Sequence, residues 1–380
     1  MSRWPGKYVI GLTGNIGTGK SVVRRMLEHL GAYGIDADAI SHRVIEKGAP
    51  GYAQVVDTFG RYILDDRQQV NRRRLGRIVF SDPEALQMLE NIIHPLVSRA
   101  IDMITQRVRQ QVVVIEAIKL LEGDLAAECS SIWVSYAPPD VQLARLLNKR
   151  GMSESDARQR IEAQSPQEEK TDRAQVVIRN VSTFEDTWKQ VLAAWKQVVP
   201  TEYQMSAETQ TSHVGRQGEL GVEVGRPTHA EEIAAFCRQE KMQDGRLSNA
   251  SAVMEAFGEK AFLLLRQGQS LVGFAGWQVE NLVSRTTELY LAPGIPEESA
   301  LSLLTEYIER QSASLQCEVA FIFVRPALAK TEVWKKLGYR AISIDQLSIP
   351  VWIEAARESM PPNTTLLLKQ LREDRILRPI

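Results

Sequence analysis

The chain has 380 residues, of which 44% are hydrophobic and 24% charged, and its formal net charge is −1. This composition is that of an ordinary globular protein long enough for two domains. It excludes the strongly charged classes, so we expect neither nucleic acid nor a membrane as a partner. Three widely spaced cysteines, Cys129, Cys237 and Cys317, lack metal-ligand spacing, which favours reduced thiols and a cytoplasmic protein.

The first half of the chain alternates strands with helices. A buried strand is expected over residues 7–12, a helix over 20–30 and a short strand ending near Asp36. Asp82 and Pro83 predict the start of a long helix, which we expect to break at His94-Pro95. The remaining strands and helices are expected at 111–118, 130–137, 139–151, 153–164, 174–180 and 183–199. The alternation predicts an α/β domain with a parallel sheet at 1–199.

A polar, aperiodic stretch at 200–218 predicts a linker, so we expect residues 1–199 to fold without the rest of the chain. A second α/β pattern fills 219–380. It begins with a strand at 220–224, two helices within 229–257 and a hairpin that turns on Gly268. A strand at 285–292, a helix at 297–311, a strand at 317–324 and a helix at 329–338 follow. The apolar tail at 345–371 is expected to supply a docking strand or a dimer contact, so a homo-oligomer stays open.

A glycine-rich loop lies between the first strand and the first helix. It fits the pattern G-x-x-x-x-G-K-[ST], in which backbone N–H groups and a helix N-terminus surround phosphates. The lysine is expected to reach the β- and γ-phosphates and the serine to hold Mg²⁺, so ATP and Mg²⁺ are the expected cofactors. The residues of this predicted ATP site are Gly14, Asn15, Ile16, Gly17, Thr18, Gly19, Lys20 and Ser21.

Two aspartates, Asp36 and Asp38, follow the second strand. In a parallel sheet this end of the strand faces the nucleotide crevice. A carboxylate at that place is suited to accept a proton from an attacking hydroxyl group. Capping of the next helix explains either aspartate equally well.

Several motifs together resemble those of dephospho-CoA kinases. Besides the glycine loop they are "DAD", "GAPGYAQVVDTFG", "NRRRLGRIVF", "LENIIHPLV" and "RIEAQ", in the family's order and spacing over residues 7–199. The resemblance implies a P-loop kinase with a mobile lid. Such an enzyme phosphorylates the ribose 3′-hydroxyl of dephospho-CoA with ATP and Mg²⁺, the last step of coenzyme A synthesis.

The resemblance also implies roles for individual residues. Asp38 is expected to be the general base, His94 and Arg74 to lie near the acceptor, and Asn180 to border the adenine. Arg145 and Arg150 fall in the lid segment, where Arg150 is expected to act on the transferring phosphate together with Lys20.

The chain departs from the family at the D-x-P-L-L-x-E segment, which here reads "EAIKLLE". Glu116 replaces the aspartate, and Lys119 is expected either to pair with Glu116 or to bind a substrate phosphate. The lid's R-D becomes Arg150-Gly151, and the A-D before the last strand becomes Ala174-Gln175.

The second half resembles acetyltransferases of the GNAT type in its order of elements, which implies a mixed sheet. Its chemistry differs from theirs. Pro296, Glu297 and Glu298 stand where that family binds a pyrophosphate on a glycine loop, and Trp334 stands where a tyrosine serves as an acid. We expect a non-catalytic domain that retains at most CoA or acyl-CoA binding, the alternative being an active N-acetyltransferase.

The resulting hypothesis is a dephospho-CoA kinase fused to a GNAT-like domain. Two other hypotheses remain for the first half. One is another P-loop kinase of small metabolites, against which the DAD and HPL motifs argue. The other is a nucleotide-gated sensor, against which Asp38 and the lid arginines argue.

Overall fold

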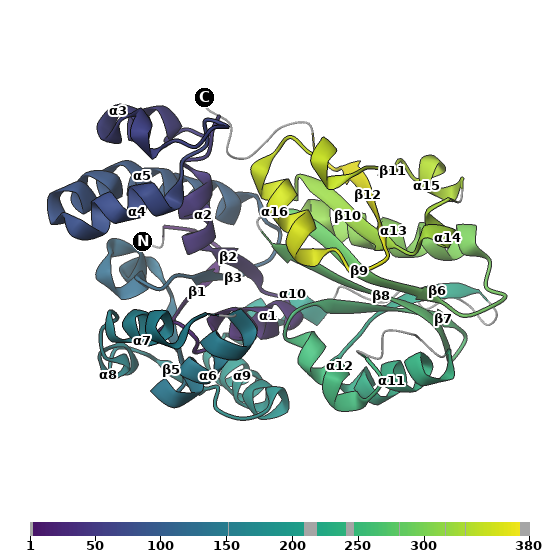
Figure 1. Cartoon of the computed structure of the whole chain (residues 1–380). Coiled ribbons are helices and arrows are strands. Elements are labelled where there is room, and N and C mark those ends of the chain that lie inside the picture. Colours follow the sequence, from purple (N-terminus) through teal and green to yellow (C-terminus); the bar gives the residue numbers. More distant parts are fainter. Residues whose placement is uncertain are drawn as a thin grey trace.

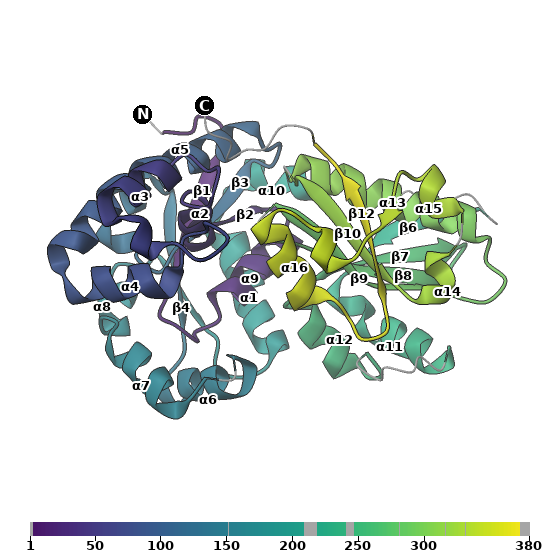
Figure 2. The ribbon, with the colours of Figure 1, turned by 45° about the horizontal axis from the view of Figure 1, so that its top comes forward.

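The computed structural model describes residues 3–150, 152–208, 219–240, 247–280, 282–315, 317–330 and 332–372. Two α/β halves lie side by side, the first built on a five-stranded sheet and the second on a seven-stranded sheet (Figures 1 and 2). The expected fold class is confirmed for both halves. Among the described helices, none combines the length and the apolar character needed to cross a membrane.

The first sheet has the strand order β2-β3-β1-β4-β5, and all its strands run parallel. Neighbouring residues of β3 face opposite layers: Val112 and Val114 pack beneath α1 and α9, and Val113 and Ile115 pack with α2 and α5. The carboxyl ends of β1, β2 and β3 therefore meet at one edge. The strands are β1 (Tyr8–Thr13), β2 (Tyr33–Asp36), β3 (Val112–Glu116), β4 (Ser131–Tyr136) and β5 (Val176–Arg179). The helices are α1 (Lys20–His29), α2 (Ala37–Arg43), α3 (Tyr52–Phe59), α4 (Arg72–Ser81), α5 (Pro83–Arg107), α6 (Pro139–Arg150), α7 (Glu154–Glu162), α8 (Gln167–Thr171), α9 (Phe184–Val198) and α10 (Thr201–Glu208).

Local capping signals locate two helix starts correctly. Asp82 accepts a hydrogen bond from the Glu84 N–H at 2.9 Å, and Ser153 accepts one from the Asp156 N–H at 3.2 Å. The break predicted at His94-Pro95 is wrong, because α5 continues through both residues. Both are exposed, so water can satisfy the carbonyl that loses its N–H partner at the proline.

The stretch predicted as a linker is partly helical. Its first residues form α10, where the ring centroid of Tyr203 lies 5.8 Å from that of Tyr8 on β1. Tyr203 packs against the core beneath α1 and α9, which explains why a polar segment is ordered here. Residues 209–218 lie outside the described residues.

The second sheet has the order β11-β12-β10-β9-β8-β7-β6. Of its described strand pairs, β9 and β10 run parallel and the others antiparallel. Helix α13 packs on one face, and α11, α12 and α16 pack on the other. The strands are β6 (Leu220–Val224), β7 (Ala261–Gln267), β8 (Ser270–Glu280), β9 (Val283–Leu291), β10 (Val319–Val324), β11 (Arg340–Ala341) and β12 (Thr365–Gln370). The helices are α11 (Ala230–Gln239), α12 (Ala250–Phe257), α13 (Glu297–Ser314), α14 (Pro326–Ala329), α15 (Val333–Lys336) and α16 (Pro350–Ser359).

Two details of the second half differ from the prediction or refine it. The helix expected at 329–338 is two short helices, α14 and α15. The apolar tail forms α16 and β12, and β12 pairs with β10 and β11 of the same chain. The docking strand thus completes the chain's own sheet.

Candidate active site

The glycine loop connects β1 to α1 at the carboxyl edge of the first sheet. Gly14, Gly17 and Gly19 have φ angles of +148°, +76° and +89°, a region that favours glycine. A Cβ atom at Gly14 would clash with the Ser135 carbonyl, and one at Gly19 with the Asn180 amide. Glycine therefore lets the loop backbone lie directly against β4 and the end of β5.

Lys20 is buried and folds back across this loop. Its Nζ donates to the carbonyl oxygens of Gly14 at 3.0 Å and Asn15 at 3.4 Å. The segment between α7 and α8 holds the loop from outside, since the Ile16 N–H donates to Gln164 Oε1 at 2.7 Å. The loop is thus preformed, with its ammonium group inside it.

Two further predicted residues lie against the same loop. Arg145 on α6 donates to the carbonyl oxygens of Gly17 at 3.1 Å, Thr18 at 3.3 Å and Asn180 at 2.9 Å. Asn180, directly after β5, donates from Nδ2 to Thr18 O at 2.9 Å. Both side chains therefore support the wall of the loop. The side chain of Arg150, at the end of α6, lies outside the described residues.

Ser21 faces a buried carboxylate at the end of β3. Its Oγ donates to Glu116 Oε1 at 3.0 Å, and Arg24 Nε donates to Glu116 Oε2 at 2.8 Å. No group of three or more metal-ligating side chains occurs among the described residues. Mg²⁺ in kinases typically takes one or two protein oxygens and completes its shell with phosphates and water. Ser21 and Glu116 fit that requirement.

Asp36 and Asp38 have different roles in the structure. Asp36 caps α2, accepting from the Ala39 N–H at 2.8 Å, whereas Asp38 lies in the first turn and accepts from the Ile118 N–H at 3.1 Å. Burial, and then the charge of Glu116, raise the pKa of Asp36 to about 6. Burial also raises the pKa of Asp38, opposed by the hydrogen bond from Ile118 and the charge of Lys20.

A residue that sequence reasoning missed completes this cluster. Lys170 on α8 is buried, and its Nζ donates to Ile118 O at 3.3 Å. Burial and the charge of Lys20 lower its pKa, and its own charge acts on Asp38. No periodicity distinguishes this lysine from a solvated one, because α8 is only five residues long.

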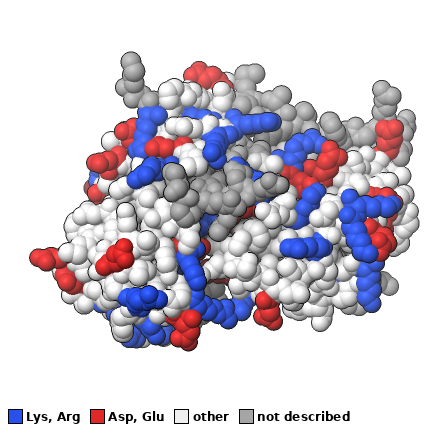
Figure 3. All heavy atoms as spheres, turned by 90° about the horizontal axis from the view of Figure 1, so that it is seen from above, with Lys and Arg blue, Asp and Glu red and all other residues white. Residues whose placement is uncertain are grey.

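The three other residues predicted to bind the substrate, Arg74, His94 and Lys119, lie outside the glycine loop and the Asp38 cluster. Arg74 on α4 donates to Leu64 O at 2.6 Å, and His94 is exposed on α5. The Lys119 ammonium is 3.1 Å from Glu90 Oε1 and 60% of its side chain is exposed. Its alternative partner, Glu116, instead bonds to Ser21 and Arg24. On the face in Figure 3, basic side chains lie among acidic ones over both halves.

Comparisons with known proteins identify the first half. A family model described as "Dephospho-CoA kinase" matches residues 8–186. The dephospho-CoA kinases of Aquifex aeolicus and Geobacter metallireducens are 42% and 41% identical over 190 and 192 residues. Each alignment covers 50% of this chain and 96% of the relative. The chain belongs to the dephospho-CoA kinase family. Since these relatives are aligned over almost their whole length, the second half of this chain is additional to what they share with it.

Solved structures resemble each half separately. A Thermus thermophilus protein is 30% identical with a TM-score of 0.47, and the match covers 51% of this chain and 98% of that one. A GNAT-family acetyltransferase from Staphylococcus aureus Mu50 is 13% identical with a TM-score of 0.32. That match covers 40% of this chain and 100% of the other.

Proposed function

We propose that this protein transfers the γ-phosphoryl group of ATP to the 3′-hydroxyl of dephospho-CoA, giving CoA and ADP. The observation that carries the proposal is the meeting of Asp38, Lys20 and Lys170 beside the glycine loop of a dephospho-CoA kinase family member. A base and two cations are what phosphoryl transfer to an alcohol requires.

Asp38 serves as the general base in this proposal. Its carboxylate takes the proton of the 3′-hydroxyl while that oxygen bonds to the γ-phosphorus and the bond to ADP breaks. The Ile118 N–H holds the carboxylate in place. Lys20 and Lys170 stabilise the negative charge on the phosphoryl oxygens, and we assign the same role to Arg150.

Mg²⁺ held by Ser21, with Glu116 beside it, would neutralise phosphate charge. Arg145 and Asn180 keep the loop shaped for the nucleotide. Arg74, His94 and Lys119 are proposed to contact the acceptor. The cytoplasm is the proposed location, which the reduced state of the three cysteines supports.

An acceptor panel tests the proposal against its rivals. The purified full chain is given Mg-ATP together with one acceptor at a time, and ADP release is followed. The acceptors are dephospho-CoA, adenosine, other nucleosides and shikimate. We expect turnover that depends on dephospho-CoA. Preference for another alcohol would favour a different small-metabolite kinase, and nucleotide binding without turnover on any acceptor would favour a sensor.

For the second domain we propose that no acetyl transfer takes place. Glu297 and Glu298 occupy the first turn of α13, and Glu298 is already paired with Lys336 at 2.7 Å. Trp334 is buried and donates to Leu328 O at 2.8 Å, so it supplies no acid. The full chain should transfer no acetyl group from acetyl-CoA to a panel of amines. Turnover on any amine would overturn this assignment.

A further inference from the structure

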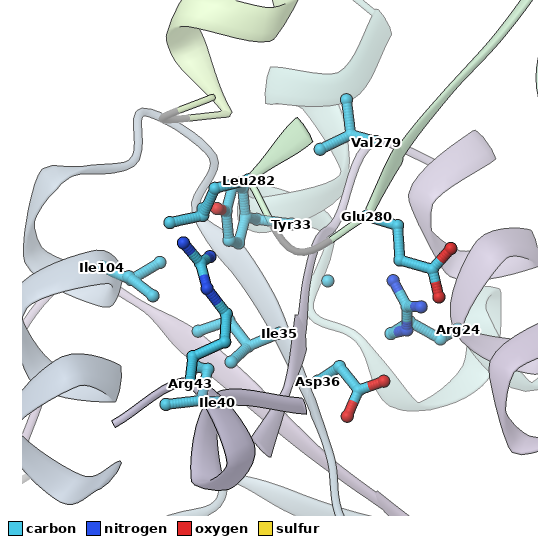
Figure 4. A pocket seen from close by; sticks show the side chains of 11 residues that line it. Arg24, Tyr33, Ile35, Asp36, Ile40, Arg43, Ile104, Val279, Glu280 and Leu282 are labelled. Carbon is cyan, nitrogen blue, oxygen red and sulfur yellow. The ribbon is translucent and has the colours of Figure 1, made fainter. Parts of the chain in front are cut away.

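The turn residue Leu282, directly before β9 of the second domain, inserts into the core of the kinase half. Leu282 is 9% exposed and packs in the same hydrophobic cluster as Tyr33, Ile35, Ile40 and Ile104. Its φ of +61° is unfavourable for leucine and persists only where packing holds it. Figure 4 shows Leu282 beside the Tyr33 ring, with Arg43 pointing toward both.

A buried ion pair lies next to this turn. Arg43 Nη2 is 3.5 Å from Glu318 Oε1, and the two side chains are only 4% and 2% exposed. The Glu318 N–H donates to Leu282 O at 2.8 Å, which ties the start of β10 to the inserted turn. The hydroxyl of Tyr33 donates to Leu315 O at 2.9 Å. Three contacts of the second domain thus converge on one part of the kinase half.

That part is the unit that carries Asp38. Tyr33 begins β2 and Arg43 ends α2, so the second domain holds both ends of a segment with Asp36 and Asp38 between them. Helix α2 has only seven residues, too few to be stable without tertiary packing. The position of Asp38 therefore depends on what packs against β2 and α2.

We propose that the second domain is an intramolecular positioning element for the kinase site, in which Leu282 and Glu318 are positioning residues for Asp38. The proposal rests on the kinase function above only for its activity readout. It gives the additional domain a role that needs neither a ligand nor chemistry of its own.

The test uses two single variants of the full chain, Glu318→Gln and Leu282→Ala. We expect kcat to fall at least tenfold, since displacement of a catalytic group by about 1 Å costs up to about 100-fold. The KM for ATP should stay within twofold, because the glycine loop has other supports. Amide hydrogen exchange should rise in residues 33–44. Arg43→Gln combined with Glu318→Gln should lose no more activity than the worse single variant, since both act through one contact.

Two controls separate positioning from general destabilisation. His29→Ala removes another contact between the halves, the 2.6 Å hydrogen bond between His29 Nε2 on α1 and the carbonyl oxygen of Phe257 on α12. This variant should lower Tm without changing kcat or exchange in 33–44. Glu306→Gln makes the same chemical change in an exposed pair with Arg310 and should change nothing.

The outcomes separate the two proposals. Unchanged kcat and unchanged exchange in 33–44, or a loss of Tm alone, would overturn the positioning role. If the wild-type chain phosphorylates no dephospho-CoA, the proposed function fails, and raised exchange confined to 33–44 in both variants would still support positioning.

Discussion

Replacing Asp36 by asparagine should stabilise the protein at neutral pH. Asparagine is nearly the same shape and is an equally good cap for α2, but it carries no charge. The pKa of Asp36 rises from 3.8 to about 6 because its carboxylate is buried and faces Glu116. Folding therefore disfavours the ionised form. The ionised Asp36 carboxylate therefore lowers the free energy of unfolding, and the neutral asparagine of the variant does not.

The size and sign of the effect follow from this pKa. A shift of roughly two units, at 1.36 kcal/mol per unit, corresponds to about 3 kcal/mol above pH 6, where Asp36 is ionised in the folded protein. The cost is about half as large at pH 5. It vanishes below pH 3.8, where folded and unfolded states are both protonated. Burial of the new amide opposes the gain, so we expect about 1–3 kcal/mol at pH 8.

Urea unfolding at pH 5 and pH 8, followed by tryptophan fluorescence, measures the difference. Asp82→Asn is the matched control, because it makes the same change at the exposed cap of α5 and should alter stability by less than about 0.5 kcal/mol at either pH. An Asp36→Asn variant that is less stable than wild type at pH 8, or whose effect is the same at both pH values, would refute the reasoning.

Five further predictions concern the site and the join between the halves. Lys20→Ala should reduce turnover by orders of magnitude while the fold stays intact; a near-wild-type rate would show that the loop lysine does not serve catalysis. Asp38→Asn should lower kcat by roughly 10²–10⁴-fold with little change in ATP affinity, and a large loss of ATP binding with modest loss of kcat would make Asp38 a metal-site or structural residue. In the wild type, the raised pKa of Asp38 should place the acid limb of kcat/KM above that of an ordinary aspartate. Lys170→Met should lower kcat, whereas Lys170→Arg should retain activity and move the alkaline limb of the pH profile to higher pH. The reason is that the lowered pKa of Lys170 makes the lysine lose its proton at a lower pH than arginine does. Identical pH profiles of wild type and Lys170→Arg would exclude Lys170 from the site. A fragment of residues 1–208 should have a lower Tm and a lower kcat than the full chain, and equal values would show that the halves are independent.

Local signals in the sequence predicted the parts of the fold that local chemistry determines. The glycine loop, the Asp82 and Ser153 caps and the β-branched strands are each specified within about ten residues, and the structure has them. The His94-Pro95 break failed because an exposed proline interrupts the bonding of a long helix only slightly. Helix α10 was missed because its order depends on Tyr203 packing against Tyr8, almost two hundred positions earlier.

The site was predictable only where it lies in one motif. Asp38 and Ser21 come from recognisable patterns, but the partners that define their chemistry are distant in sequence. Lys170 and the Arg24–Glu116 pair reach the site only after the sheet has formed. The expectation that residues 1–199 fold alone stays a prediction, and it was made without the Arg43–Glu318 pair, which joins positions 275 residues apart. Nothing near Arg43 indicates that it becomes buried.

The most direct test of the account is the identity of the product made from dephospho-CoA. Purified full-length protein, Mg-ATP and dephospho-CoA are incubated together, and the acceptor product is examined by mass spectrometry and ³¹P NMR. The account predicts one added phosphate as a monoester on the ribose 3′-oxygen, formed in equal amount to ADP. A phosphate on another oxygen, or ADP formed without any phosphorylated acceptor, would contradict it.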